Sequence, residues 1–117
     1  MKTDKNLFRV EHILDSIQKI EFILKDLTYD KFKEDWQSQD IIIRNLEIIG
    51  EACRHIDENI KSLYPEVAWL EANSMRNVLI HEYFGVSPRQ VWLAVTEDIP
   101  ILKKQILKIK SDLTTKP

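Results

Sequence analysis

The amino-acid sequence predicts an all-α protein, an up-and-down four-helix bundle, from three observations. Glycine and proline are scarce, with 2 and 4 in 117 residues, whereas an all-β domain needs many turns rich in both. Apolar residues recur every three or four positions along most of the chain, which is the period of a helix with one buried face. The length suits one hydrophobic core, so we expect a single helical domain over residues 1–117.

Two long helices are predicted in the first half of the chain. The first covers about residues 6–27 and has helically spaced apolar positions: Val10, Leu14, Ile17 and Leu24. The second covers about residues 30–60 and repeats the pattern at Ile42, Leu46, Ile49, Cys53 and Ile56. Gly50 inside it costs about 1 kcal/mol relative to Ala and is typical of a close approach by another backbone. Because this segment is long, a bend within it or an early end are both open.

Two further helices are predicted in the second half. Pro65 disfavours helix in the residue before it, so the third helix should cover about residues 66–84 and end at Gly85. The last helix should begin with Ser87 as its N-cap and Pro88 in its first turn. Pro100 lies inside the last helix and should kink or split it.

Composition excludes several classes of protein. The 17 basic and 19 acidic residues give a net charge of −2, so bulk charge does not argue for nucleic-acid binding. The single cysteine, Cys53, cannot form an internal disulfide, and we expect a reducing, cytoplasmic location and a core role for this residue. No signal peptide and no apolar run of about 20 residues are present, so we expect no membrane partner. His12, His55 and His81 have no metal-ligand spacing, so we expect no metal and no cofactor.

A polar cluster in the third predicted helix is the candidate site. Arg76, Asn77, His81 and Tyr83 carry polar groups in a segment that otherwise has the pattern of a core helix. Asn77 and His81 are four apart and share a face, whereas Arg76 and His81 are about 140° apart on an ideal helix. Either the helix loosens before Gly85, or the site combines residues from two chains.

These residue types suit the chemistry of a phosphodiester. The guanidinium of Arg76 offers a planar fork of donors for phosphate, and His81 can exchange a proton near neutral pH. RNA cleavage by its own 2′-hydroxyl needs a base, an acid and stabilisation of the charge that develops on phosphorus. One chain supplies one suitable histidine and two chains supply two, so we expect a symmetric homodimer with a shared cleft.

The cluster resembles a known motif. Arg76-Asn77-x3-His81-x-Tyr83 is similar to the Arg-x4-His-x-Tyr motif of HEPN-domain proteins, and specifically of the HepT-type toxins. The resemblance covers nearly the whole chain, because other segments are also similar to that family: Ile49-Gly50-Glu51-Ala52, Pro65 with Trp69, Tyr83-Phe84-Gly85-Val86, Val91-Trp92 and Ile99-Pro100. Ser74 stands where a glycine is expected, a departure that bears on local packing.

The resemblance implies a function as well as a fold. It implies a HEPN-like helical homodimer that acts as a metal-independent endoribonuclease toxin, with Arg76, Asn77 and His81 as the catalytic residues at a cleft between protomers. The implied substrate is RNA, and the implied antitoxin is a nucleotidyltransferase of the MntA type that transfers AMP to Tyr83. The added bulk and negative charge would occupy space that the RNA phosphate needs. ATP and Mg²⁺ would belong to the partner.

Other roles for the same residues stay open. The chain could be a non-catalytic HEPN module that binds a nucleotide or a nucleotidyltransferase through the same motif, or a purely structural helical dimer. Arg76 could pair with a glutamate, Asn77 could brace a turn, His81 could be structural and Tyr83 could only pack its ring. The intact pair of Arg76 and His81 favours the nuclease. Elsewhere we expect the tryptophans to be core or interface anchors, the other two histidines to be surface or structural, and the lysines of residues 103–110 to form a solvated face or widen an RNA footprint.

Overall fold

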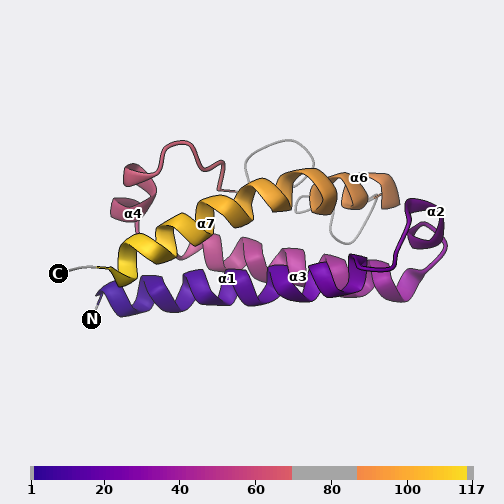
Figure 1. Ribbon diagram of the computed structural model, residues 1–117, viewed down its shortest axis with the longest axis horizontal. Coiled ribbons are helices and arrows are strands. Elements are labelled where there is room, and N and C mark those ends of the chain that lie inside the picture. The colour runs from indigo at the N-terminus through magenta and orange to yellow at the C-terminus, as the bar shows by residue number, and fades with distance from the viewer. Residues whose placement is uncertain (1, 70–86, 116–117) are drawn as a thin grey trace.

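The computed structural model describes residues 2–69 and 87–115, and all regular elements within these ranges are helices. The long elements are α1 (Lys2–Leu24), α3 (Trp36–Arg54) and the rod formed by α6 (Pro88–Leu93), η1 (Ala94–Asp98) and α7 (Ile99–Thr114). Two short helices, α2 (Tyr29–Phe32) and α4 (Glu58–Leu63), flank α3 along the chain. The long helices lie roughly along one axis, and the chain reverses between α1 and α3 (Figure 1). The prediction of an all-α fold is confirmed.

The buried face of α1 differs from the predicted one. Val10, Ile13, Ile17 and Ile20 are fully buried, whereas Leu14 and Leu24 are only partly buried. The buried set keeps a spacing of three, four and three, so it is as helical as the predicted set. These residues are buried because α1 packs against both α3 and α7, and Ile13 and Ile20 are fully covered by that packing. Leu14 and Leu24 lie at its edge.

The second predicted helix is broken into three, so the early end is confirmed and the continuous helix is wrong. Asp35 begins α3 as its N-cap, and its carboxylate accepts hydrogen bonds from the backbone N–H groups of Gln37 and Ser38 at 3.2 and 3.4 Å. The Ser38 hydroxyl donates to the same carboxylate at 2.7 Å. The hydrogen bonds from Ser38 hold the pKa of Asp35 below its ordinary value.

The far end of α3 is fixed by a contact with the start of α1. The side chain of Asn6, which is buried, donates to the Asp57 carboxylate at 3.2 Å and accepts from the Asp57 backbone N–H at 3.2 Å. The two residues are 51 positions apart in the chain. This pair ties the first turns of α1 to the residues that follow α3, and so sets the antiparallel alignment of the two helices.

The core is formed by the inner faces of α1, α3 and the α6–α7 rod. Cys53 is 1% exposed, and burial raises the pKa of its thiol to about 12, so the prediction of a core cysteine is confirmed. Gly50 is also buried. Phe32 of α2 is fully buried and lies 5.3 Å from the ring of Trp92, which closes one end of the core.

The last helix begins as predicted, and the predicted effect of Pro100 is seen in part, as a change of helix type next to that residue. The Ser87 hydroxyl accepts from the Gln90 backbone N–H at 3.1 Å, and Pro88 lies in the first turn. Ahead of Pro100 the helix widens into the π-helical turn η1, in which the N–H of Ile99 reaches back five residues to the Ala94 carbonyl. Proline has no N–H to donate, so the interruption precedes Pro100. On either side of η1 the rod meets different partners: α6 contacts α2 and α3, and α7 contacts α1.

Candidate functional site

The motif residues Arg76, Asn77, His81 and Tyr83 lie in residues 70–86, outside the part of the chain that the structure describes. Their expected roles therefore stay predictions. The structure does place the two residues that flank this segment, Trp69 and Ser87.

Hydrogen bonds hold residues 64–66, which precede this segment, against α7. The Tyr64 hydroxyl donates to the Asp112 carboxylate at 2.5 Å, and the Gln105 side chain donates to the backbone carbonyl of Glu66 at 3.1 Å. Burial, then the hydrogen bond to Asp112 and the negative charge of that residue, raise the pKa of Tyr64 to about 12. With Val67 buried between these contacts, the chain reaches residue 69 from a fixed position.

Residues 66–69 are not helical, so the third predicted helix does not begin at Glu66. Trp69 has a positive φ of 50°, a conformation that is costly for a residue with a bulky side chain. Its ring packs on the core and lies 5.9 Å from the Lys61 ammonium, and its indole N–H is buried and has no hydrogen-bond partner among the described residues. The Gln105 side chain holds the Glu66 carbonyl, and the backbone of Trp69 has a left-handed conformation. Residues 66–69 therefore form a turn where the first helical turn was predicted.

The other tryptophans occupy different environments. Trp92 is partly buried and packs against Tyr29 and Phe32, as expected for a core anchor. Trp36 is 66% exposed, so it is not a core residue, and its role at an interface stays a prediction.

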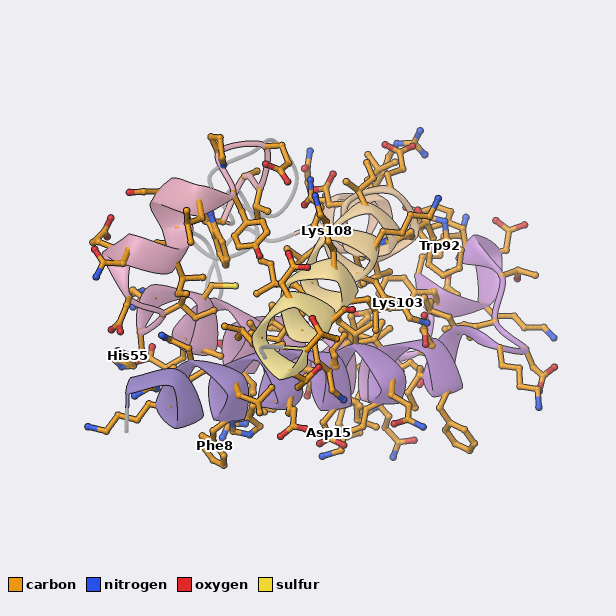
Figure 2. The ribbon with its side chains drawn as sticks, turned by 60° about the vertical axis from the view of Figure 1, so that its left-hand side comes forward. Phe8, Asp15, His55, Trp92, Lys103 and Lys108 are labelled. Atoms are coloured by element: carbon orange, nitrogen blue, oxygen red, sulfur yellow. The ribbon has the colours of Figure 1, made fainter. Side chains whose placement is uncertain are left out.

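The lysines of α7 divide into two pairs. Lys103 contacts Glu21 at 2.8 Å and Lys110 contacts Glu11 at 3.6 Å, so these two join α7 to α1. Lys104 and Lys108 are exposed and have no ion pair with the described residues. Figure 2 shows Lys103 and Lys108 on the same helix. Only part of the predicted lysine face is therefore solvated, because half of it stabilises helix packing.

The other two histidines lie on neighbouring helices. His12 of α1 is exposed, with its ring centroid 5.7 Å from that of Phe8. His55, which follows α3, is also exposed, and its Nε2 lies 3.1 Å from the Glu51 carboxylate. The expectation that both are surface residues is confirmed. Among the described residues no group of three or more His, Cys, Asp or Glu side chains is arranged to hold a metal ion.

Comparison with known proteins identifies the family. The profile of the family described as "Ribonuclease HepT-like" matches residues 13–109, which include the Arg76–Tyr83 motif. The chain belongs to the HepT-like ribonuclease family. Its HEPN-type resemblance is thereby confirmed, and the all-helical structure of the described ranges is consistent with this family.

Individual relatives agree with this assignment. A Thermococcus cleftensis protein named "Probable ribonuclease HepT" is 43% identical over 101 residues, which cover 86% of this chain and 92% of the relative. A Methanocaldococcus jannaschii protein named "Gamma-glutamylcyclotransferase and putative RNase" is 42% identical over 113 residues. That match covers 97% of this chain but 50% of the relative, so the HepT-like chain spans about half of the larger protein. No solved structure matches the chain. In the described ranges, no helix combines the length and apolarity needed to cross a membrane.

Proposed function

We propose that this HepT-like ribonuclease is the toxin of a toxin–antitoxin pair and cleaves RNA internally without a metal ion. The observation that carries the proposal is the family match over residues 13–109, within which the Arg76–Tyr83 motif is intact. Relatives named as ribonucleases at about 40% identity support the same chemistry.

The proposed reaction is attack by the RNA 2′-hydroxyl on the adjacent phosphorus. His81 acts as general base or acid, Arg76 binds the phosphate and stabilises its added charge, and Asn77 positions the reacting groups. The P–O5′ bond breaks, the leaving oxygen takes a proton, and a 2′,3′-cyclic phosphate remains. Because Arg76 and His81 are about 140° apart on an ideal helix, we propose that a homodimer assembles the cleft from two copies of the motif.

The proposed control is AMP transfer to Tyr83 by an MntA-like nucleotidyltransferase. The phenolic oxygen of Tyr83 would attack the α-phosphorus of ATP and release pyrophosphate, with ATP and Mg²⁺ held by the partner. The adduct would place a negative charge two residues from His81, where it repels the RNA phosphate.

We further propose that residues 1–117 form one domain that works in the cytoplasm. Supporting this, α1 and α7, from opposite ends of the chain, pack directly on each other. The buried, reduced Cys53 suits a reducing compartment.

The test is cleavage of a small structured RNA in EDTA by the wild type and by His81→Ala. We expect the wild type to leave cyclic-phosphate ends and the variant to be slower by about 10²–10⁴-fold, the usual contribution of a general acid or base. His55→Ala, which changes an exposed histidine, is the matched control and should keep the wild-type rate at saturating RNA.

Three results would count against parts of the proposal. Equal cleavage by wild type and His81→Ala would exclude His81 as the catalytic group. No cleavage by a wild type whose intact mass shows no AMP would favour a binding module. A monomer in sedimentation at assay concentration would remove the shared cleft.

A further inference from the structure

An open groove runs between α1 and α3 at the end of the molecule where α1 begins. Its volume is about 580 Å³, within the range of small-molecule sites. One side is formed by Phe8, Arg9 and His12 of α1, and Arg44 of α3 lies on the other side. The side chains of Ile48 and Ala52 add apolar surface between them.

The α1 side of the groove carries an exposed aromatic surface. Phe8 is 64% exposed and points away from the core (Figure 2). Its ring is tilted by 44° against that of His12, with the centroids 5.7 Å apart. An apolar ring of this size in water is unfavourable by itself, and a planar group stacked on it would cover it. The bases of single-stranded RNA are such planar groups.

The lining of the groove carries the charged residues Arg9, Arg44, Glu47 and Glu51, and one of its two arginines has no ion-pair partner among the described residues. Arg9 makes no ion pair or hydrogen bond with any described residue. The Arg44 guanidinium is 72% exposed and lies 3.9 Å from the Glu47 carboxylate, so most of its donors are free. A guanidinium binds a phosphate through two parallel hydrogen bonds, which makes these two arginines suitable for a nucleotide phosphate.

The acidic residue nearest the His55 end is already engaged. The Glu51 carboxylate lies 3.4 Å from the Arg54 guanidinium and 3.1 Å from Nε2 of His55. The exposed Arg54 guanidinium therefore offsets part of its negative charge at the surface. The groove thus combines the unpaired Arg9 and the exposed Arg44 with an exposed ring, and basic and aromatic groups together bind unpaired nucleotides.

We propose that the α1–α3 groove binds one nucleotide of single-stranded RNA, with the base on Phe8 and His12 and the phosphate at Arg9 and Arg44. The choice of RNA rests on the proposed function, because the ligand is the substrate of that ribonuclease. The groove holds RNA without taking part in bond breaking. Its residues therefore act on substrate affinity, and the turnover at saturating RNA does not depend on them.

The test measures binding of a fluorescein-labelled, fully 2′-O-methylated octanucleotide by anisotropy. The blocked 2′-hydroxyl prevents cleavage, so affinity is measured apart from chemistry. We expect Phe8→Ala and the double variant Arg9→Gln/Arg44→Gln each to weaken binding by about tenfold, since one stacked base, or hydrogen bonds to one charged phosphate, has roughly that effect. The double variant should also reduce the slope of log K against log salt by about 0.7, the value for one phosphate on a single strand.

Matched controls are available elsewhere on the chain. Phe22→Ala removes another exposed phenylalanine of α1, at 76% exposure, and Lys108→Gln removes an exposed cation of α7. Both lie outside the groove and should change affinity less than twofold. None of these residues is buried, so we expect wild-type thermal unfolding for every variant, which circular dichroism checks.

The outcomes separate this proposal from the proposed function. If both groove variants bind the oligonucleotide as tightly as the wild type, the proposed RNA site is wrong, even if His81→Ala abolishes cleavage. Weakened binding with a raised KM and unchanged kcat in the groove variants would support it, even if His81 proves dispensable. If Phe8→Ala dissociates a dimer in sedimentation, the groove is a contact between copies of the chain and the proposal is wrong.

Discussion

Replacing Ile13 and its neighbour Leu14 one at a time by alanine tests the rotation of α1 about its axis. The two side chains differ little in size and follow each other in the sequence, but Ile13 is fully buried and Leu14 is only partly buried. The structure therefore predicts unequal losses of stability from two equal deletions of side-chain atoms.

The magnitude follows from burial. Either substitution removes three carbons, and each buried carbon contributes about 0.8 kcal/mol, which gives roughly 2.4 kcal/mol for Ile13 before any cavity is counted. The cavity left between α1, α3 and α7 raises the expected cost to about 3–4 kcal/mol, inside the usual range for such core deletions. Leu14 loses only part of its contacts, so its cost should be about 1 kcal/mol.

The assay is urea unfolding followed by helical circular dichroism, with the two variants and the wild type at one protein concentration. Equal slopes of the unfolding free energy against urea concentration would show that the substitutions change stability without changing the compactness of the unfolded chain. A cost for Leu14→Ala equal to or greater than that for Ile13→Ala would refute the rotation of α1 described above, and with it the alignment of the groove residues.

Three further predictions concern single polar contacts. Hydrogen bonds from Ser38 lower the pKa of Asp35 in the folded state. The ionised carboxylate therefore stabilises the fold above pH 3.8, and this stabilisation is lost as pH falls through the lower folded-state pKa. Asp35→Ala should flatten that part of an acid-unfolding curve. The pKa of Tyr64 is raised from 10.0 to about 12 in the folded state. The neutral hydroxyl therefore stabilises the fold fully below pH 10, and this stabilisation is lost as pH rises to about 12. Tyr64→Phe should remove this loss of stability at alkaline pH. Ser87→Ala should cost about 1 kcal/mol in urea unfolding, as an N-cap that loses its acceptor.

Local signals of the sequence predicted the parts of the fold that depend on a few neighbouring residues. Ser87 and Pro88 begin α6 because an N-cap acceptor and a proline in the first turn act within four residues. Asp35 could not be recognised in the same way. The residues on both sides of it are mostly polar, including Glu34 and Gln37, and an aspartate in such a segment is the same residue type whether it caps a helix or faces water.

Features set by distant contacts were not predictable. Ile13 and Leu14 both fit a helical stripe with Val10 and Ile17, and only the packing of α3 and α7 selects between them. The groove depends on the alignment of α1 with α3, which the contact between Asn6 and Asp57 fixes across 51 residues. The polar cluster of the motif, in contrast, stands out by its residue types, its resemblance to the HEPN motif gave the ribonuclease hypothesis, and the family match supports that hypothesis. The roles of its individual residues stay predictions.

The start of α1 and the end of α7 lie at the same end of the molecule, with α2 and α6 at the opposite end (Figure 1). A second polypeptide joined to either terminus would therefore extend from one pole of the bundle and leave the other pole uncovered. The Methanocaldococcus jannaschii relative, of which the matched region is half, shows that a chain of this kind occurs within a larger protein. In such a fusion the point of attachment sets which surface stays accessible, so an affinity tag or surface anchor placed at either terminus would present the α2–α6 pole to solution.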